Sequence, residues 1–334
     1  MNLFDDLRKR ESAAPFERLA RKALVVYGME EAKLVPLTHE SQVVFRVSDT
    51  SEIEDVARSS YALHVYPRGW DRDRILRMLL WQTALLREAN VLCPEPILTR
   101  DGELVQSLST PGVSGFRQVS VLSWVKGRVL DSAEWTVEHA RQTGRLIGTL
   151  HRQAETFSLP QDLTPKRRTA ETLEESVDSV RLARAHAAEE ETLFADAVGR
   201  IRQTMSSLGT APDVAGLVHA NLSLDHVLFD RKDARPIGFT HARWGYYLYD
   251  LASLDLGLSE LEDGSLLRGG LLDGYRETRP TETDLAEHLG TFALLRLLDE
   301  LQSLPEPSEP GSTAAIRSRS GRIVDAIRQG VDLL

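Results

Sequence analysis

GLVHANLSLDHVLFD, residues 216–230, and RPIGFTHARWGYYLYDLA, residues 235–252, are the two stretches that decide the fold of this 334-residue chain. In the first stretch, the apolar pair Leu217–Val218 leads into a polar loop, and the apolar run Val227–Phe229 follows that loop. In the second stretch, Pro236–Phe239 is a further short apolar run. This pattern predicts a strand, a loop, a strand, a turn and a third strand, with polar side chains presented at the strand ends.

The two stretches resemble the catalytic segment of the family of aminoglycoside phosphotransferases, choline kinases and homoserine kinases, which has the protein-kinase-like fold. That family reads H-G-D-x-x-x-x-N in its catalytic loop, then D-F or D-L, and then A-R/G-x-G-x-x-x-x-D-L-A. His219 and Asp250 match the family letters. In the family, the residue equivalent to Asp250 holds the catalytic loop by hydrogen bonds and takes no part in the chemistry. The resemblance therefore implies a structural role for Asp250.

The reactive letters of the family motif are absent from this chain. Asn221 stands in place of the catalytic aspartate, His226 in place of a metal-binding asparagine, and Gly238 in place of the metal-binding aspartate. A gapped alignment would move the last position to His241, which also brings no carboxylate. An asparagine side chain cannot accept a proton, so base catalysis by Asn221 is lost. Mg²⁺ prefers carboxylate oxygens, so the resemblance does not lead us to expect Mg²⁺ as a cofactor.

The positions that contact the nucleotide phosphates in the family also differ. The alternation in Tyr61–Tyr66 predicts a strand, and His64 stands where the family has a lysine or arginine. The spacing in Arg72–Ala89 predicts a helix, and Met78 stands where the family has the glutamate that pairs with that cation. Losing one member of a buried ion pair costs roughly 3–5 kcal/mol. The absence of both members indicates that the pair was replaced as a unit.

The predicted connection between the two lobes lies at Ser123–Gly127, after a predicted strand at Val119–Val125. In the family, the backbone of this hinge holds adenine. Hydrogen bonds from the backbone of Ser123 and Val125 need no particular side chain, so weak binding of ATP or adenosine remains compatible with this sequence.

The fold predicted from these motifs is α+β, a two-lobe protein-kinase-like fold. A small, β-rich lobe is expected over residues 1–122, with an N-terminal helix, an antiparallel sheet and one helix packed on the sheet. A large helical lobe is expected over residues 123–334, with the degenerate catalytic loop at 216–252. The other predicted elements are helices at Phe16–Tyr27, Glu134–Phe157, Leu258–Tyr275, Glu282–Leu304 and Ala314–Leu334, two helices within Glu171–Ser207, a strand at Leu37–Val47 and a loop at Pro305–Thr313.

The charge, the cysteine content and the apolar runs of the chain limit the kinds of molecule that we expect it to bind. The net charge of −10 and the pI near 5.5 argue against nucleic acid or an anionic membrane as a partner. The single cysteine, Cys93, excludes an internal disulfide and fits a reducing cytoplasm. No apolar run has transmembrane length. A small molecule or another protein remains as the partner, and the sequence names neither the ligand nor the oligomeric state.

Together, the substitutions favour a pseudoenzyme, a small-molecule phosphotransferase fold retained for ligand binding or regulation. The five substituted positions are His64, Met78, Asn221, His226 and Gly238.

Two alternatives stay open. In the first, the chain is an active ATP-dependent phosphotransferase for a small hydroxyl substrate of the aminoglycoside, choline or homoserine type, and Asp225 has moved into the metal site. In the second, His219, His226 and His241 form a metal site, because three histidines near one pair of loops are suitable ligands for zinc.

Overall fold

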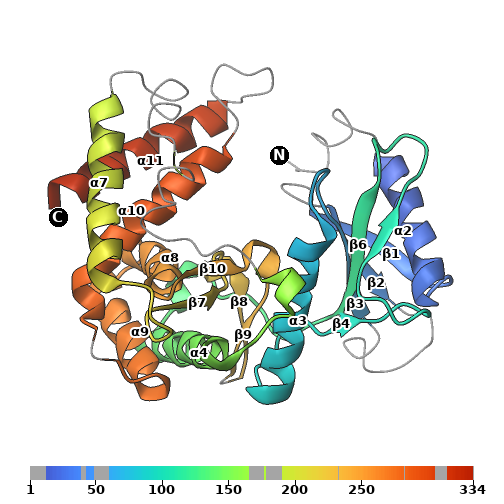
Figure 1. The fold of residues 1–334 in the computed structure, drawn as a ribbon, viewed down its shortest axis with the longest axis horizontal. Helices are drawn as coiled ribbons and strands as arrows, with labels where there is room; N and C mark the ends of the chain where they lie inside the picture. Colours follow the sequence, from blue (N-terminus) through green and yellow to red (C-terminus); the bar gives the residue numbers. More distant parts are fainter. Residues whose placement is uncertain are drawn as a thin grey trace. The chain divides into compact units, whose positions relative to one another are not determined.

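The computed structural model describes residues 13–38, 43–48, 60–164, 177, 190–231, 233–281, 283–304 and 314–333. Contacts divide the chain into two compact units, which are Met1–Gly127 with Phe157–Thr164, and Arg128–Thr156 with Pro165–Leu334. The first unit is built on an antiparallel sheet and the second is mostly helical, as the predicted α+β class requires (Figure 1).

The sheet of the first unit has the strand order β1-β2-β3-β6-β4, with β5 paired to β6 and all pairs antiparallel. Its strands are β1 (Lys33–Thr38), β2 (Val43–Ser48), β3 (Ser60–Val65), β4 (Pro96–Ile97), β5 (Gln106–Leu108) and β6 (Arg117–Ser123). Helix α2 (Ala13–Tyr27) packs its apolar side chains against one face of this sheet, where Leu63 and Val65 of β3 are buried (Figure 1). Alternation along β3 therefore places Ala62 and His64 on the opposite face.

Helix α3 (Arg72–Glu88) also belongs to the first unit. The carboxylate of Asp71 caps its N-terminus by accepting a hydrogen bond from the Arg74 amide at 2.5 Å. Met78 lies on the buried side of this helix and is 4% exposed. The short 3₁₀ turn Gln161–Leu163 packs on α3, which explains why the segment 157–164 joins this unit.

The second unit contains α4 (Val137–Thr156), α7 (Glu191–Leu208), α8 (Leu248–Ser259), α9 (Gly264–Thr278), α10 (Leu285–Ser303) and α11 (Ala314–Leu333). It also contains two short antiparallel ribbons. One pairs β7 (Ala215–Val218) with β10 (Arg243–Tyr246), and the other pairs β8 (Val227–Asp230) with β9 (Asp233–Pro236). The loop between β7 and β8 therefore starts at His219, as the sequence predicted.

Two strand predictions differ from the structure in their bounds. Within Leu37–Val47, the strand predicted to follow a loop at residues 38–42 is β2, which begins at Val43, and the strand β1 before the loop was not predicted. Residues 39–42 lie outside the described part of the chain. The third strand predicted at Pro236–Phe239 ends at Pro236, because Gly238 adopts a φ of 81° and the 3₁₀ turn Phe239–His241 follows it.

Two predicted helices are each interrupted. The helix predicted at Leu258–Tyr275 is split between α8 and α9, with Asp263 at a φ of 62° before α9. The helix predicted at Glu134–Phe157 begins only at Val137, because Glu134 belongs to a separate 3₁₀ turn whose capping box it forms with Asp131. Of the helices predicted within residues 171–207, only α7 is described, and the loop predicted at residues 305–313 lies outside the described residues.

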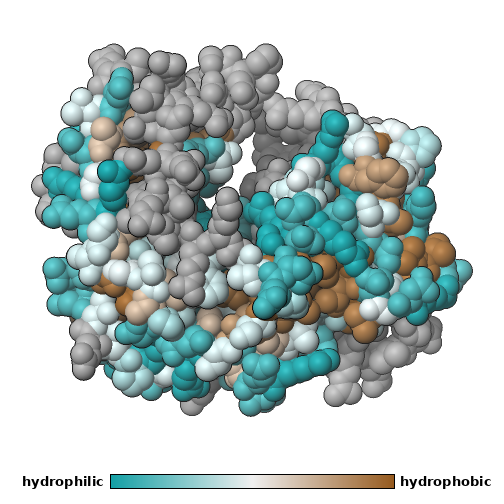
Figure 2. Space-filling model, in the orientation of Figure 1, coloured by the Kyte–Doolittle hydropathy of each residue, from teal (hydrophilic) through white to brown (hydrophobic). Residues whose placement is uncertain are grey.

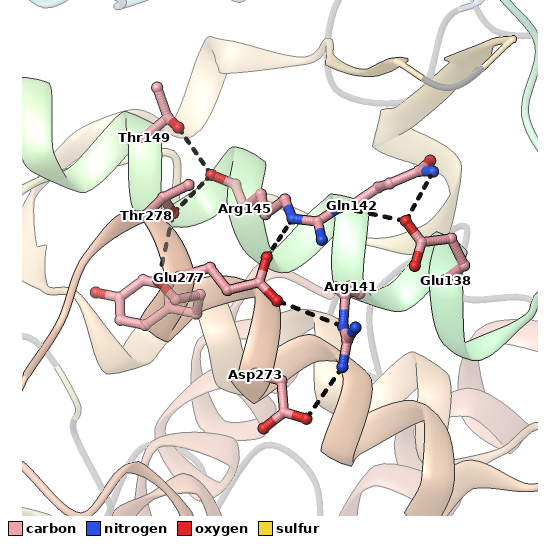
Figure 3. Close-up of polar contacts among 9 residues, drawn as sticks. Glu138, Arg141, Gln142, Arg145, Thr149, Asp273, Glu277 and Thr278 are labelled. Atoms are coloured by element: carbon pink, nitrogen blue, oxygen red, sulfur yellow. Dashed lines mark hydrogen bonds and ion pairs between the residues drawn. The ribbon is translucent and has the colours of Figure 1, made fainter.

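Helices α4 and α9 lie side by side and approach unusually closely (Figure 3). A Cβ atom built on Gly144 would lie 2.0 Å from the carbonyl oxygen of Leu271, and one built on Gly274 would lie 1.9 Å from that of Arg141. Only glycine allows backbone contact at these distances. Ion pairs flank the contact, in which Arg141 and Arg145 of α4 both reach Glu277 of α9 (Figure 3).

The surface of the first unit carries hydrophobic residues among hydrophilic ones (Figure 2). The large exposed hydrophobic residues of this unit are Val25, Val35, Leu37, Leu92, Leu98 and Phe116. Among the described helices of the whole chain, none has the length and apolar composition needed to cross a membrane.

Candidate functional site

The loop after β7 is held by the carboxylate of Asp250, which lies in the first turn of α8 and is completely buried. One of its oxygens accepts a hydrogen bond from the His219 amide at 2.8 Å, and the other accepts one from the Ala220 amide at 2.7 Å. Ala220 has a φ of 59°, a left-handed conformation that L-residues adopt rarely. The two hydrogen bonds fix the loop in this conformation.

Asp250 is in turn held by a buried relay of hydrogen bonds. His151 Nε2 lies 3.1 Å from the same Asp250 oxygen that binds the His219 amide, and His151 Nδ1 lies 3.0 Å from the Tyr275 hydroxyl. Arg279 donates to that hydroxyl at 3.0 Å and to Glu155 at 2.7 Å. Because Arg279 can only donate, the consistent arrangement has Tyr275 donating to Nδ1 and Nε2 donating to Asp250.

The pKa shifts agree with this arrangement. Burial lowers the pKa of His151 more than the carboxylate of Asp250 raises it, so the ring is neutral. Burial raises the pKa of Asp250, but the hydrogen bonds that the carboxylate accepts from His151 and from the His219 amide bring it below its usual value. A neutral histidine therefore orients an ionised carboxylate, and that carboxylate orients the loop.

His219 is buried and uses both ring nitrogens within the loop. Its Nε2 donates to the Ile237 carbonyl at 3.0 Å, and its Nδ1 accepts from the Asn221 amide at 3.3 Å. The ring contacts Phe239 with centroids 4.4 Å apart. Burial lowers the pKa of His219 to about 3, so the ring is neutral and serves as a spacer between the two loops.

His226 packs on Gly238. A Cβ atom built on Gly238 would lie 2.4 Å from Cδ2 and 2.9 Å from Nε2 of His226, so the imidazole occupies the space that a side chain at position 238 would need. The ring is held by Ser223, whose hydroxyl lies 2.9 Å from Nδ1, and by a hydrogen bond with the backbone of Asn221. Burial lowers the pKa of His226. The two substituted positions are thus in direct contact.

This arrangement does not suit Mg²⁺. The donors at the substituted positions are the amide of Asn221 and the ring of His226, and Gly238 supplies no side chain. Mg²⁺ is a hard ion that requires several oxygen ligands in near-octahedral geometry. The groups present do not fit the ion.

The alternative zinc site is not formed either. Within the described residues, no group of three or more histidine, cysteine, aspartate or glutamate side chains is arranged to hold a metal ion. His219 has committed both ring nitrogens to the loop backbone, and His226 is bound by Ser223. His241 lies in the 3₁₀ turn after Gly238 and also has interactions of its own.

Asp225 lies beside His226 in the 3₁₀ turn Leu224–His226, and its side chain is exposed. Its charge raises the pKa of His226, against the larger effect of burial. Asp225 is thus a carboxylate directly before His226 in the chain.

A family model described as the phosphotransferase enzyme family matches residues 33–288. The chain belongs to this family. No protein of curated function matches it significantly in sequence.

Solved structures of phosphotransferases share the fold. An amicoumacin kinase, solved in complex with AMP-PNP, Ca²⁺ and Ami, aligns with a TM-score of 0.75 and 17% identity over 93% of this chain and 92% of that one. A microcompartment-associated aminopropanol kinase aligns with a TM-score of 0.75 and 21% identity over 92% and 94%. A spectinomycin phosphotransferase in complex with ADP and spectinomycin aligns with a TM-score of 0.60 and 13% identity over 94% and 98%. These likenesses confirm the predicted kinase-like fold.

His64 and Met78, the residues predicted to stand at nucleotide-contacting positions, lie in the first unit. Burial lowers the pKa of His64 to about 4, and its Nδ1 is buried without a hydrogen-bond partner in the described part of the chain. A neutral His64 and an apolar Met78 leave these positions without the family's cation and carboxylate. That His64 shares a cleft with Asn221 and Gly238 remains a prediction.

The backbone and side chain of Ser123, a residue predicted to belong to the hinge, already make hydrogen bonds within the first unit. The Ser123 amide donates to the Glu95 carbonyl at 2.8 Å, and the Ser123 hydroxyl accepts from the Glu95 amide at 2.9 Å. The Trp124 ring is covered by the guanidinium of Arg46 at 4.8 Å. Adenine binding by the backbone of Ser123 and Val125 remains a prediction.

Sequence reasoning missed much of the support around the loop. The sequence did not identify the buried relay behind Asp250, in which His151 binds Tyr275 and Tyr275 binds Arg279. Tyr275 and Arg279 are four residues apart and so fall on one face of a helix end, but that spacing alone names no partner on another helix. The sequence feature that could have pointed to this relay is the pair Leu150-His151.

We expect the stability of the protein to fall as the pH is lowered from about 6.5, the usual pKa of histidine. The histidines with lowered pKa values are His64, His151, His219 and His226. Each is neutral when folded and takes up a proton when unfolded, so its contribution is complete above about pH 6.5 and is lost as the pH falls toward the folded pKa.

One such histidine lowers the free energy of unfolding by about 1.4 kcal/mol per pH unit, so a slope of at least this size is expected between pH 6 and pH 5. Urea unfolding at pH 7, 6 and 5 measures it. A free energy of unfolding that stays constant over this range would contradict neutral buried histidines.

Proposed function

We propose that this chain is a non-catalytic member of the phosphotransferase family, which keeps the loop framework for ligand binding or regulation. The observation that carries the proposal is the packing of His226 on Gly238, at 2.4 Å from the position of a Cβ atom. The ring fills the place from which a metal-binding side chain at position 238 would extend. Reinstating a carboxylate there would require His226 to move.

The remaining requirements of phosphoryl transfer are also missing. The reaction needs positioned Mg²⁺, a cation on the phosphates and a group that orients the attacking hydroxyl. His64 has a pKa near 4 and carries no charge at neutral pH. Asn221 cannot act as a base. The loop framework, held by Asp250, is intact without these groups.

The second candidate function is an active ATP-dependent phosphotransferase for a small hydroxyl compound of the aminoglycoside, choline or homoserine type. The similarity to solved kinases supports this class in general terms. Asp225 is the residue on which it depends, because this carboxylate is exposed in the same turn as His226. A cytoplasmic location is proposed for either function.

A direct assay separates the two candidates. We expect the purified protein to transfer no phosphate from Mg-ATP to choline, homoserine or an aminoglycoside, measured by product formation with radiolabelled ATP. Asp225→Ala and wild-type protein should then be indistinguishable. Sustained transfer by the wild type that is abolished in Asp225→Ala would establish the active enzyme instead.

Calorimetric titration with adenosine and ATP, each with and without Mg²⁺, provides the matching binding measurement. A site that holds no metal ion, and that has a neutral His64 where the family has a cation, should bind adenosine and ATP only weakly, and Mg²⁺ should not strengthen the binding of ATP. Tight ATP binding that required Mg²⁺ would contradict the non-catalytic function.

A further inference from the structure

Helix α10 presents three charged residues, Arg296, Asp299 and Glu300, at spacings that place them on one side of the helix. Asp299 is fully engaged. One of its oxygens accepts hydrogen bonds from Arg243 at 2.6 Å and from the Tyr249 hydroxyl at 2.8 Å. This carboxylate therefore has two strong donors.

Glu300 is engaged as well, but by a residue of another helix. Arg319 of α11 donates twice to one Glu300 oxygen, at 2.7 and 2.9 Å. Arg296 approaches the other oxygen only to 3.9 Å, which is too long for a hydrogen bond. Within the described residues, Arg296 makes no closer ion pair and no hydrogen bond.

The Arg296 side chain is 21% exposed. None of its nitrogen atoms is both buried and without a hydrogen-bond partner, so its unpaired N–H donors are open to solvent and to a ligand. Arg296, Arg243 and Arg319 together face the two carboxylates of Asp299 and Glu300, so the cluster carries one positive charge in excess.

The position of Arg296 connects it with the loop. Asp299, which follows Arg296 by three residues on α10, binds the hydroxyl of Tyr249, the neighbour of the Asp250 that holds the loop. In agreement with this geometry, the positive charge of Arg296 opposes protonation of His226, although burial is the larger cause of the lowered pKa of that ring. Asp225 is the nearby opposite charge that also acts on His226, but it is exposed and therefore strongly screened by solvent. Arg296 is thus close enough to His226 for its charge to act on the imidazole.

We propose that Arg296 binds an anionic group of the ligand, a carboxylate or a phosphate monoester, directly and without a metal ion. The planar guanidinium can donate two parallel hydrogen bonds to either group. This inference rests on the proposed function, because it assigns a chemical class to the ligand of the same loop site. A fixed cation on α10 then supplies the positive charge that a metal would otherwise bring.

The test uses inorganic phosphate and acetate as probes, titrated calorimetrically into the full-length protein at constant ionic strength with EDTA present. Wild-type protein should bind at least one probe saturably, and the stronger probe identifies the phosphate or the carboxylate as the preferred group. Arg296→Gln should weaken that binding by about tenfold or more, the usual effect of losing a charge-assisted hydrogen-bonded pair.

Arg322→Gln is the control, because it removes an exposed cation from α11 and leaves the ion pair of Arg319 with Glu300 in place. Its affinity should stay within about twofold of the wild type. Arg296→Lys keeps the charge but loses the planar fork, so it should fall between wild type and Arg296→Gln. This variant keeps the test decisive if Arg296→Gln fails to fold.

Equal binding by wild type and Arg296→Gln, or no saturable binding of either probe, would overturn the inference. Neither result depends on phosphate transfer, so the inference can fail while the non-catalytic function stands. Conversely, metal-dependent turnover together with Arg296-dependent anion binding would retain the anion site and reject the non-catalytic function.

Discussion

Gly274→Ala is expected to lower the free energy of unfolding by about 3 kcal/mol or more, at or beyond the upper end for overpacking. The new methyl group would lie 1.9 Å from the Arg141 carbonyl oxygen and 2.9 Å from the Arg141 Cα. These are backbone atoms of a helix, so they cannot move aside as a flexible side chain can. Helices α4 and α9 would have to separate, and the ion pairs from Arg141 and Arg145 to Glu277 would separate with them (Figure 3).

Gly269→Ala on the same helix is the matched control. A Cβ atom built on Gly269 meets no atom within 4 Å, and the residue is exposed. Alanine in the interior of a helix is more stable than glycine by about 0.5–1 kcal/mol, so this variant should be slightly stabilised. Urea unfolding followed by circular dichroism measures both variants. Equal effects of the two substitutions would contradict the close contact of the helices.

The sequence shows the glycines of this contact, but it does not show that they allow helices α4 and α9 to pack closely. Gly144 and Gly148 are four residues apart on α4, as are Gly270 and Gly274 on α9. That spacing indicates a narrow stripe on each helix, and it does not indicate which helix packs against the stripe. The pairing joins residues about 130 positions apart, which is a property of tertiary packing and not of periodicity.

The loop was better predicted, because its motif links residues over a short range. The matching letters named His219 and Asp250, and the structure joins the His219 amide to the Asp250 carboxylate. The contact of His226 with Gly238 was not predicted, because it depends on the left-handed conformation of Gly238 and on the space left by its missing side chain. In the sequence, His226 and Gly238 look like two independent substitutions, whereas in the structure the ring of His226 fills the space left by the missing side chain of Gly238.

Arg296 was missed for a different reason. An arginine at that position of a helix cannot be distinguished in the sequence from an ordinary solvent-facing charge paired with Glu300 four residues later. The structure shows that Glu300 is hydrogen-bonded by Arg319, and that Arg296 Nη1 lies 3.9 Å from the other Glu300 oxygen. The break between α8 and α9 was missed similarly, since no proline marks it and Asp263 adopts its left-handed conformation without being a glycine.

Asp250→Asn is expected to cost about 3 kcal/mol of unfolding free energy, in the range for breaking a buried, hydrogen-bonded charge network. In the wild type, one Asp250 oxygen accepts from His219 and His151, and the other accepts from Ala220. An asparagine has one acceptor oxygen and one NH₂ group in these two places. In either orientation, the NH₂ group faces a backbone N–H, so one loop amide loses its acceptor and meets a donor.

Asp255→Asn is the control for this substitution, because Asp255 is also buried on α8. Its bidentate partner Arg268 has a side chain that is 47% exposed and can turn to water. The cost there should be about 1 kcal/mol, close to that of a surface ion pair. Urea unfolding gives both values. Hydrogen exchange at the His219 and Ala220 amides provides a local measurement. In Asp250→Asn, exchange at these amides should become faster than the loss of global stability explains, whereas in Asp255→Asn it should not. Unchanged exchange at these two amides would mean that Asp250 does not hold the loop.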